Sequence, residues 1–179
     1  KRDWSSDVCS SDLAKITYYQ RQNLEVTGRI LEEKRLKLGI GKGDVLIDED
    51  GIGGGLVDFM GYRGFVNNSK PVDNPKLYNE WGQKVHENFD NLKSQCYFKL
   101  SERINKNGIF LECDDVAKQL IIEELEQVKQ KSVDSDLKKG VVSKDVVKDI
   151  IGRSPDFADA LMMREYIELR PRPFVAAKY

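Results

Sequence analysis

The sequence has few of the residues on which several common kinds of site depend. Its three cysteines, Cys9, Cys96 and Cys113, are odd in number and lack the spacing of a zinc ligand set. They predict neither a disulfide framework nor a zinc site, and they favour a reducing, cytoplasmic setting. The one histidine, His86, lies in a polar stretch beside Glu87, so catalysis by a Ser-His or Cys-His pair has little support.

Long apolar runs and an excess of positive charge are also missing. No apolar run approaches the roughly 20 residues of a membrane span, so we expect no membrane association. The net charge of -1 gives no overall sign of nucleic-acid binding, although a bound divalent metal would change the charge locally. The composition that remains, 40% hydrophobic and 33% charged residues in a chain of 179, is typical of a soluble globular domain.

The first 13 residues have no hydrophobic periodicity, and the tripeptide Ser-Ser-Asp occurs in them twice. They resemble a translated sequencing adaptor, and they lack the apolar centre of a signal peptide. We therefore exclude residues 1–13 from the fold, expect no stable secondary structure in them, and expect the natural protein to begin upstream. Residues 14–168 are assigned to one partial domain, and residues 169–179 to a surface tail.

The most informative stretch is residues 45–58, which predicts a strand, a glycine-rich turn and a helix. An apolar, β-favouring run ends at Asp48, glycines follow, and helical apolar spacing begins at Leu56. Asp48 therefore falls at the carboxyl end of a strand, where open α/β sheets hold ligands. Two plainer interpretations stay open. The turn could bind phosphate, although the lysine and hydroxyl of a phosphate loop are absent, or Asp48 or Asp50 could cap the helix.

Elsewhere the pattern alternates helices with short strands, which indicates an α/β protein. Apolar residues at helical spacing predict helices over residues 16–38, 91–107, 116–128 and 143–150. Short apolar runs next to glycine or asparagine predict strands over residues 65–66, 109–111 and 140–142, and residues 71–88 are expected to form a long loop.

A second group of carboxylates lies near the carboxyl end of the chain. Ser154 and Pro155 suit the N-cap and first position of a helix, and Asp156 and Asp159 then share one face of its first turn. The helix dipole stabilises such negative charge by about 0.3–1 kcal/mol per residue, which is enough to explain one aspartate. Two aspartates among small and apolar neighbours favour carboxylates that face a buried pocket.

These segments together resemble the nuclease half of the large terminase subunit of tailed bacteriophages. The matching stretches occur in the family's order, and they span nearly all of the chain after residue 13. They are residues 47–58 (IDEDGIGGGLVD), 64–69 (GFVNNS), 91–97 (NLKSQCY), 143–145 (SKD) and 152–161 (GRSPDFADAL).

The resemblance implies an RNase H-like fold, a mixed sheet flanked by helices, with its N-terminal strands missing here. It also implies an endonuclease that cuts concatemeric viral DNA when genome packaging starts and ends, in the host cytoplasm. Two divalent ions, Mg²⁺ or Mn²⁺, are held by three or four carboxylates; one activates a water and the other stabilises the leaving oxygen. The implied partners are double-stranded DNA, the portal protein and the small terminase subunit.

Carried over residue by residue, the resemblance makes Asp48, Asp156 and Asp159 catalytic, metal-binding acids, with Asp159 as the extra ligand. We therefore expect their carboxylates to converge on one cavity. Lys144 and Arg153 are candidates for contact with DNA phosphate.

The sequence departs from the family at its amino terminus. The family's first acid lies on an earlier strand, which nothing here matches, so we expect this chain alone to be a poor nuclease. Two alternatives stay open. The chain could be a non-catalytic module of the packaging motor that docks on portal or DNA, or another RNase H-like enzyme such as a resolvase or integrase.

Overall fold

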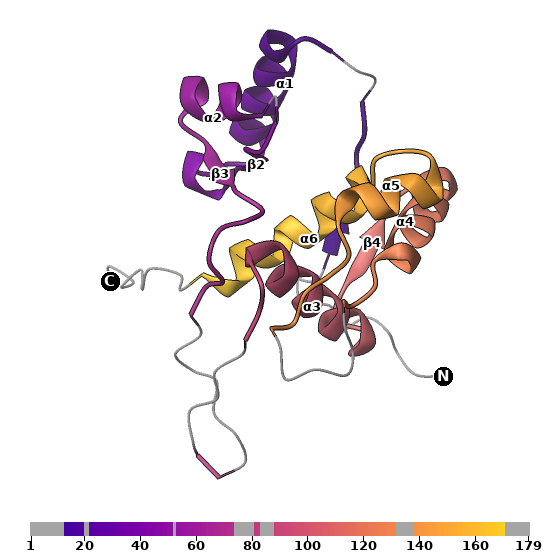
Figure 1. Cartoon of the computed structure of the whole chain (residues 1–179). Coiled ribbons are helices and arrows are strands. Elements are labelled where there is room, and N and C mark those ends of the chain that lie inside the picture. The colour runs from indigo at the N-terminus through magenta and orange to yellow at the C-terminus, as the bar shows by residue number, and fades with distance from the viewer. Residues whose placement is uncertain are drawn as a thin grey trace, which may run out of the picture.

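A computed structural model of the chain describes residues 13–19, 22–51, 53–73, 81–82, 88–131 and 138–170. Within these ranges the fold has six α-helices, one short 3₁₀ helix and four short strands (Figure 1). In chain order they are β1 (Leu13–Lys15), α1 (Leu24–Lys37), η1 (Lys42–Asp44), β2 (Leu46–Asp48), α2 (Gly54–Met60), β3 (Arg63–Phe65), α3 (Leu92–Asn105), β4 (Phe110–Glu112), α4 (Asp115–Gln127), α5 (Lys144–Ile151) and α6 (Asp156–Leu169).

The strands form two separate parallel pairs. β1 pairs with β4, with Leu13 opposite Phe110, and β2 pairs with β3, with Leu46 opposite Arg63. In Figure 1 the pair β2–β3 lies in an upper unit with α1 and α2, whereas β1 and β4 lie in the main body with the other helices. Parallel pairing places the carboxyl end of β2 beside that of its neighbour, at the edge that carries Asp48.

Helix α6 is the element around which the core is built. It packs against α3 and α4. Of the apolar stripe that the spacing of four predicts on α3, Leu92, Cys96 and Leu100 are buried, whereas Ile104 is 41% exposed. The upper unit joins this core through Phe65 of β3, which is fully buried and meets Tyr166 of α6 edge-on, with ring centroids 5.6 Å apart. The same helix therefore supports both strand pairs.

Several predicted elements are confirmed by the structure. The strand before Asp48 and the helix that begins at Gly54 lie where the pattern places them, and so do the helices over 91–107 and 143–150, within two residues. Asn91 and Ser143 cap those last two helices, accepting the backbone N–H groups of Ser94 and Val146. Cys96 and Cys113 are free thiols, whereas Cys9 and His86 lie outside the described residues.

The prediction for the amino-terminal part is wrong in two respects. Leu13, which we exclude on sequence grounds, is the first residue of β1, and the helix expected from residue 16 begins at Leu24. The later start of the helix has a local reason, because the Asn23 side chain accepts the N–H of Val26 at 2.8 Å and caps the helix there. Residues 1–12 and the tail after residue 170 lie outside the described part of the chain.

Two smaller predictions also differ from the structure. Residues 140–142 do not form a strand; Val141 makes one isolated antiparallel bridge with Gln130. On α4, Val116 is 62% exposed although we expect it on the apolar face, and the neighbouring Ala117 is buried in its place. Among the described residues no helix is long and apolar enough to cross a membrane.

Candidate functional site

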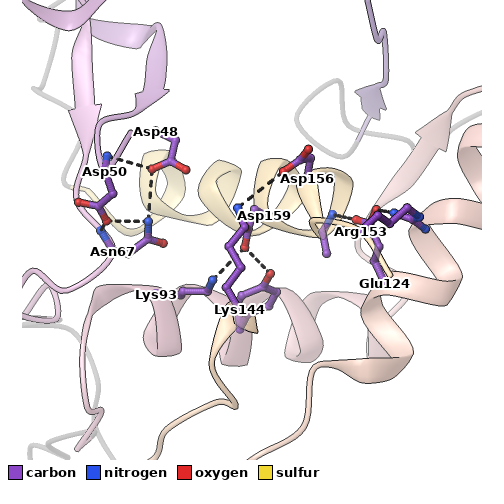
Figure 2. Close-up of polar contacts among 11 residues, drawn as sticks. Asp48, Asp50, Asn67, Lys93, Glu124, Lys144, Arg153, Asp156 and Asp159 are labelled. Atoms are coloured by element: carbon purple, nitrogen blue, oxygen red, sulfur yellow. Dashed lines mark hydrogen bonds and ion pairs between the residues drawn. The ribbon is translucent and has the colours of Figure 1, made fainter. Parts of the chain in front are cut away.

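Asp48 is placed at the end of β2 by the strand pairing. The backbone N–H of Glu49 donates to the carbonyl of Phe65 at 3.0 Å, so the two strands are joined up to the point where the acid emerges. One carboxylate oxygen of Asp48 accepts the backbone N–H of Asp50 and the side-chain amide of Asn67, each at 3.3 Å (Figure 2). Both hydrogen bonds are long, and Asp48 is half-buried, so its carboxylate is held loosely.

The glycine-rich turn is required by the close approach of the chain to Asp48. A Cβ atom at Gly53 would overlap the carbonyl oxygen of Asp48 and would lie 2.8 Å from a methyl group of Ile47. Gly53 is also the N-cap of α2, and no side chain caps that helix. The interpretation of Asp48 or Asp50 as a helix cap is therefore wrong, and the turn instead allows β2 and α2 to pack closely behind the acid.

The start of α6 carries the second group of acids, and its cap differs from the prediction. Ser154 does not cap the helix; Pro155 is the N-cap residue and contributes no side-chain hydrogen bond. Instead, Glu124 of α4, which is fully buried, accepts the backbone N–H of Ala158 at 2.7 Å. A carboxylate from another helix thus satisfies a donor of the first turn of α6.

Asp159 is the most strongly held acid of the site. It is 6% exposed; one of its oxygens accepts the Tyr97 hydroxyl at 2.8 Å and lies 3.1 Å from the ammonium of Lys93, and the other lies 2.8 Å from that of Lys144. Burial raises the pKa of Asp159, but Lys93, Lys144 and Tyr97 outweigh burial and hold that pKa below its ordinary value. Asp159 is therefore ionised and surrounded by donors at neutral pH.

Asp156 lies one turn earlier on α6 and faces solvent. Its side chain is 78% exposed, and its nearest charged partner is the ammonium of Lys144 at 3.6 Å. Lys144 thus lies between the two acids of α6 (Figure 2). Burial lowers the pKa of Lys144, but its bond to Asp159 and the charges of Asp156 and Asp48 raise that pKa by more, so the lysine stays charged.

The predicted acids meet at one cavity of about 440 Å³. Residues from three parts of the chain line it: β2, the first residue of α5, and one face of α6. The structure therefore brings Asp48 together with acids that follow it by more than a hundred residues. The lining residues are Leu46, Asp48, Lys144, Asp156, Asp159, Ala160, Met163, Arg164 and Ile167.

Arg153 does not line this cavity. Its guanidinium pairs with Glu124 and, at 2.6 Å, with Glu123, and Figure 2 shows it beyond the start of α6, on the side away from Asp48. Because Arg153 lies outside the cavity, no contact within the described part of the chain tests its role at DNA phosphate, which stays a prediction.

Three residues of the site are absent from the sequence prediction: Asn67, Lys93 and Tyr97. Asn67 orients the loop after β3, because its backbone and side-chain N–H groups both donate to Asp50 at 2.7 Å. Lys93 and Tyr97 lie four residues apart on α3, so they share a face beside its buried stripe. A lysine that directly follows a buried residue of a helix, as Lys93 follows Leu92, is the sequence pattern that could have predicted this buried ion pair.

The donor set fits a hard divalent cation in type but is not closed around one. Carboxylate oxygens are the ligands that Mg²⁺ and Mn²⁺ prefer, and the ammonium of Lys144 already occupies a position between two of them. Across the described part of the chain, however, no three Asp, Glu, His or Cys side chains lie close enough together to hold an ion. The roles of Asp48, Asp156 and Asp159 as metal ligands stay predictions.

Comparison with known proteins gives a clear result at the level of the fold. No family model matches the sequence, and no curated protein matches it either. Among solved structures, a lysine-to-alanine mutant of the nuclease domain of the large terminase subunit gp2 of bacterial virus Sf6, with manganese and beta-thujaplicinol, is similar with a TM-score of 0.67. That match has 19% identity and covers 90% of this chain and 79% of the other.

The chain has the fold of a terminase nuclease domain. The same Sf6 domain without the mutation matches with a TM-score of 0.59 and 21% identity, over 81% of this chain and 71% of that one. The mutant with calcium gives a TM-score of 0.60 and 20% identity, over 81% and 71%. The predicted RNase H-like α/β fold and the resemblance to terminase nuclease domains are thereby confirmed as structural similarity.

Proposed function

We propose that this chain is a metal-dependent DNA endonuclease domain of a phage packaging terminase. The observation that supports the proposal most is the convergence of Asp48 with Asp156 and Asp159 on one cavity, in a fold shared with terminase nuclease domains. Asp48 reaches this cavity from β2, and Asp156 and Asp159 reach it from α6, more than a hundred residues later in the chain.

In the proposed site each residue has a distinct task. Asp48 and Asp156, which are partly or largely exposed, are the ligands that a divalent ion can reach first, and Asp159 is a further ligand. Bound Mg²⁺ or Mn²⁺ would supply an activated water and a charge opposite the leaving oxygen. Asn67 orients Asp48, while Lys93 and Tyr97 hold Asp159 in place. Lys144 offers its ammonium to a phosphate of the DNA strand at the mouth of the cavity.

The proposed activity requires a further carboxylate beside Asp48 and Asp156. Within the described part of the chain, β1 pairs only with β4 and β2 pairs only with β3. The other edge of β1 and the other edge of β2 are therefore unpaired, so each two-stranded sheet can accept a further strand there. A strand added at the edge of β2 would bring its side chains to the cavity that Asp48 lines. We therefore expect little cleavage from this chain by itself, and full activity once such a strand supplies the missing acid.

The remaining parts of the proposal follow from the resemblance to terminases. The substrate is concatemeric double-stranded viral DNA, cut at the start and end of packaging. The portal protein and the small terminase subunit are the partners, and the host cytoplasm is the place of action.

Plasmid cleavage tests this function. In the chain extended by its natural upstream strand, Mg²⁺ or Mn²⁺ should support cutting, and Asp48→Ala or Asp156→Ala should abolish it while circular dichroism stays unchanged. Asp159→Ala should reduce cutting less. Asp58→Ala is the control, because Asp58 is exposed on α2 and does not line the cavity. Full cutting by an Asp48→Ala, Asp156→Ala double mutant would refute the site.

One observation favours a second candidate, a non-catalytic module that docks on DNA or portal. Across the described residues the acids do not form a closed metal site, and Asp159 is already neutralised by two lysines. Such a module would bind DNA equally well with and without divalent ions, and the extended chain would still not cut it. Metal-dependent cutting by the extended chain would exclude this candidate.

A further inference from the structure

Glu124 is a buried carboxylate that touches the machinery of the site without lining its cavity. It lies on α4 and has no exposed surface. One of its oxygens accepts the N–H of Ala158 at 2.7 Å, and the other accepts the guanidinium of Arg153, which lies two residues after the end of α5 (Figure 2). A single side chain thus holds both the connection between α5 and α6 and the first turn of α6.

The elements that Glu124 joins carry three of the residues that line the cavity. Lys144 is the first residue of α5, Asp156 is the first residue of α6, and Asp159 lies one turn further along. Residues 152–155 connect the two helices, and Gly152 there adopts a left-handed conformation with φ of +73°. The spacing of Lys144 from Asp156 and Asp159 is therefore set by how this short connection is held.

The first turn of α6 has no local device that could replace Glu124. The N-cap residue is Pro155, which offers no side-chain acceptor, so the N–H groups of the first turn need a partner from elsewhere. A carboxylate at this end of a helix also interacts favourably with the helix dipole. A buried Glu124 carboxylate without a cation would destabilise the fold, and the guanidinium of Arg153 supplies that cation.

We propose that Glu124 is a positioning residue of the site, which with Arg153 fixes the connection between α5 and α6 and thereby the geometry of Lys144, Asp156 and Asp159. The inference rests on the proposed function in so far as these residues bind an ion. Glu124 itself touches neither metal nor DNA; it acts through the backbone of α6.

Glu123 provides a matched control on the same helix. It also pairs with Arg153, at 2.6 Å, but its side chain is 46% exposed, and among the described residues it makes no hydrogen bond to α6. Glu123→Gln therefore removes a carboxylate from the same arginine and leaves the first turn of α6 capped. Any effect specific to Glu124→Gln then reports on the cap and the buried charge.

The test compares Glu124→Gln and Glu123→Gln by two measurements on this chain, below the melting temperature of every variant. The first is the set of amide NMR signals of Lys144, Ala158 and Asp159 without metal. The second is affinity for Mn²⁺, measured by water-proton relaxation. We expect Glu124→Gln to shift those signals and weaken Mn²⁺ binding about 10-fold or more, as loss of a supporting partner does at other metal sites. Glu123→Gln should leave both at wild-type values.

A further variant separates the cap from the charge. Glu124→Ala removes the acceptor for Ala158 as well, so it should weaken Mn²⁺ binding more than Glu124→Gln, which retains an amide oxygen at the same place. If Glu124→Ala does not fold, the glutamine variant decides alone.

Wild-type signals and wild-type Mn²⁺ affinity in Glu124→Gln would overturn the proposal, and so would equal losses in the two glutamine variants. If the wild-type chain binds no Mn²⁺ at all, the ion-binding part of the proposed function fails instead. The amide signals then decide the positioning role by themselves: a shift confined to Glu124→Gln supports it, and unchanged signals overturn it.

Discussion

The two sides of the cavity are built very differently. On the α6 side, Asp159 is buried, receives a hydrogen bond from Tyr97 and lies between two lysines. On the β2 side, Asp48 ends a three-residue strand in a two-stranded sheet and is held by two hydrogen bonds of 3.3 Å. Two-stranded sheets are marginally stable alone, so the β2 side depends on the packing of its sheet against α2 and, through Phe65, against α6.

The two sides therefore differ in how firmly their acids are held. On the α6 side a hydroxyl and two ammonium groups contact Asp159, whereas on the β2 side two long hydrogen bonds hold Asp48. One contact that joins the two sides is the packing of the buried Phe65 of β3 against Tyr166 of α6. Changing each side separately should therefore have effects of very different size.

Breaking the contact between the two sides should have the largest effect. Phe65→Ala removes a fully buried ring, and the cavity left behind should cost about 3–5 kcal/mol of the free energy of unfolding. Phe59→Ala is the control, because Phe59 is 87% exposed on α2, and it should change that free energy by less than about 0.5 kcal/mol. Urea denaturation measures both, and equal effects would show that β3 does not dock on α6.

Removing the charge of Asp159 should have the next largest effect. Asp159→Asn leaves Lys93 and Lys144 without their buried counter-charge, which should cost about 3 kcal/mol at pH 7. Because the pKa of Asp159 is held below its ordinary value of 3.8, this stabilisation is present above that value and is lost as the pH falls through the lower, folded-state pKa. Unfolding measured from pH 7 down to pH 3 should show the difference between the variant and wild type beginning to narrow below about pH 3.8. A constant difference across that range would contradict the ion pairing.

A smaller effect is expected at the turn behind Asp48. Gly53→Ala forces the new Cβ into the carbonyl of Asp48, so the turn must shift, at a cost of about 1–3 kcal/mol. Gly51→Ala is the matched control, since no atom lies within 4 Å of its added Cβ and its φ is not in the left-handed region. Thermal unfolding should separate the two variants, and equal melting temperatures would mean that the turn relaxes without cost.

The smallest effect on stability should come from Asp156, although it is central to the proposed activity. Its side chain is 78% exposed and lies 3.6 Å from Lys144, so Asp156→Ala should change the free energy of unfolding by less than about 0.5 kcal/mol. A loss as large as that of Asp159→Asn would mean that Asp156 has a structural role instead. Comparing these two aspartates, three residues apart on one helix, therefore distinguishes an effect on stability from an effect on the proposed activity.

Much of this architecture could be predicted from the sequence. The strand that ends at Asp48, the turn after it and the capped helices that begin at Leu92 and Lys144 follow from patterns within a few residues, and there the prediction is confirmed. The spacing predicts Asp156 and Asp159 on one helical face, and both meet Lys144, but only Asp159 faces a buried environment, because Asp156 is 78% exposed. Local signals suffice where the capping residue is close in sequence.

The remaining features depend on contacts between distant parts of the chain. Glu124 caps α6 from 34 residues away, so a local pattern could only suggest Ser154. The pairing of Asp159 with Lys93 joins α6 to α3, and it becomes visible only when those helices pack. Leu13 was excluded because its neighbours lack periodicity, yet pairing with β4 makes it part of a strand. Features of this kind cannot be predicted from local sequence patterns, because they form only when distant segments pack together.

The measurement that tests the central claim most directly is a double-mutant cycle on Mn²⁺ affinity with Asp48→Asn and Asp156→Asn. If acids from the β2 side and the α6 side hold the same ion, each single variant should weaken binding at least 10-fold, and the double variant should be little worse than either single one, because the site is already broken. Losses that multiply independently, or variants that bind Mn²⁺ as the wild type does, would contradict a shared site.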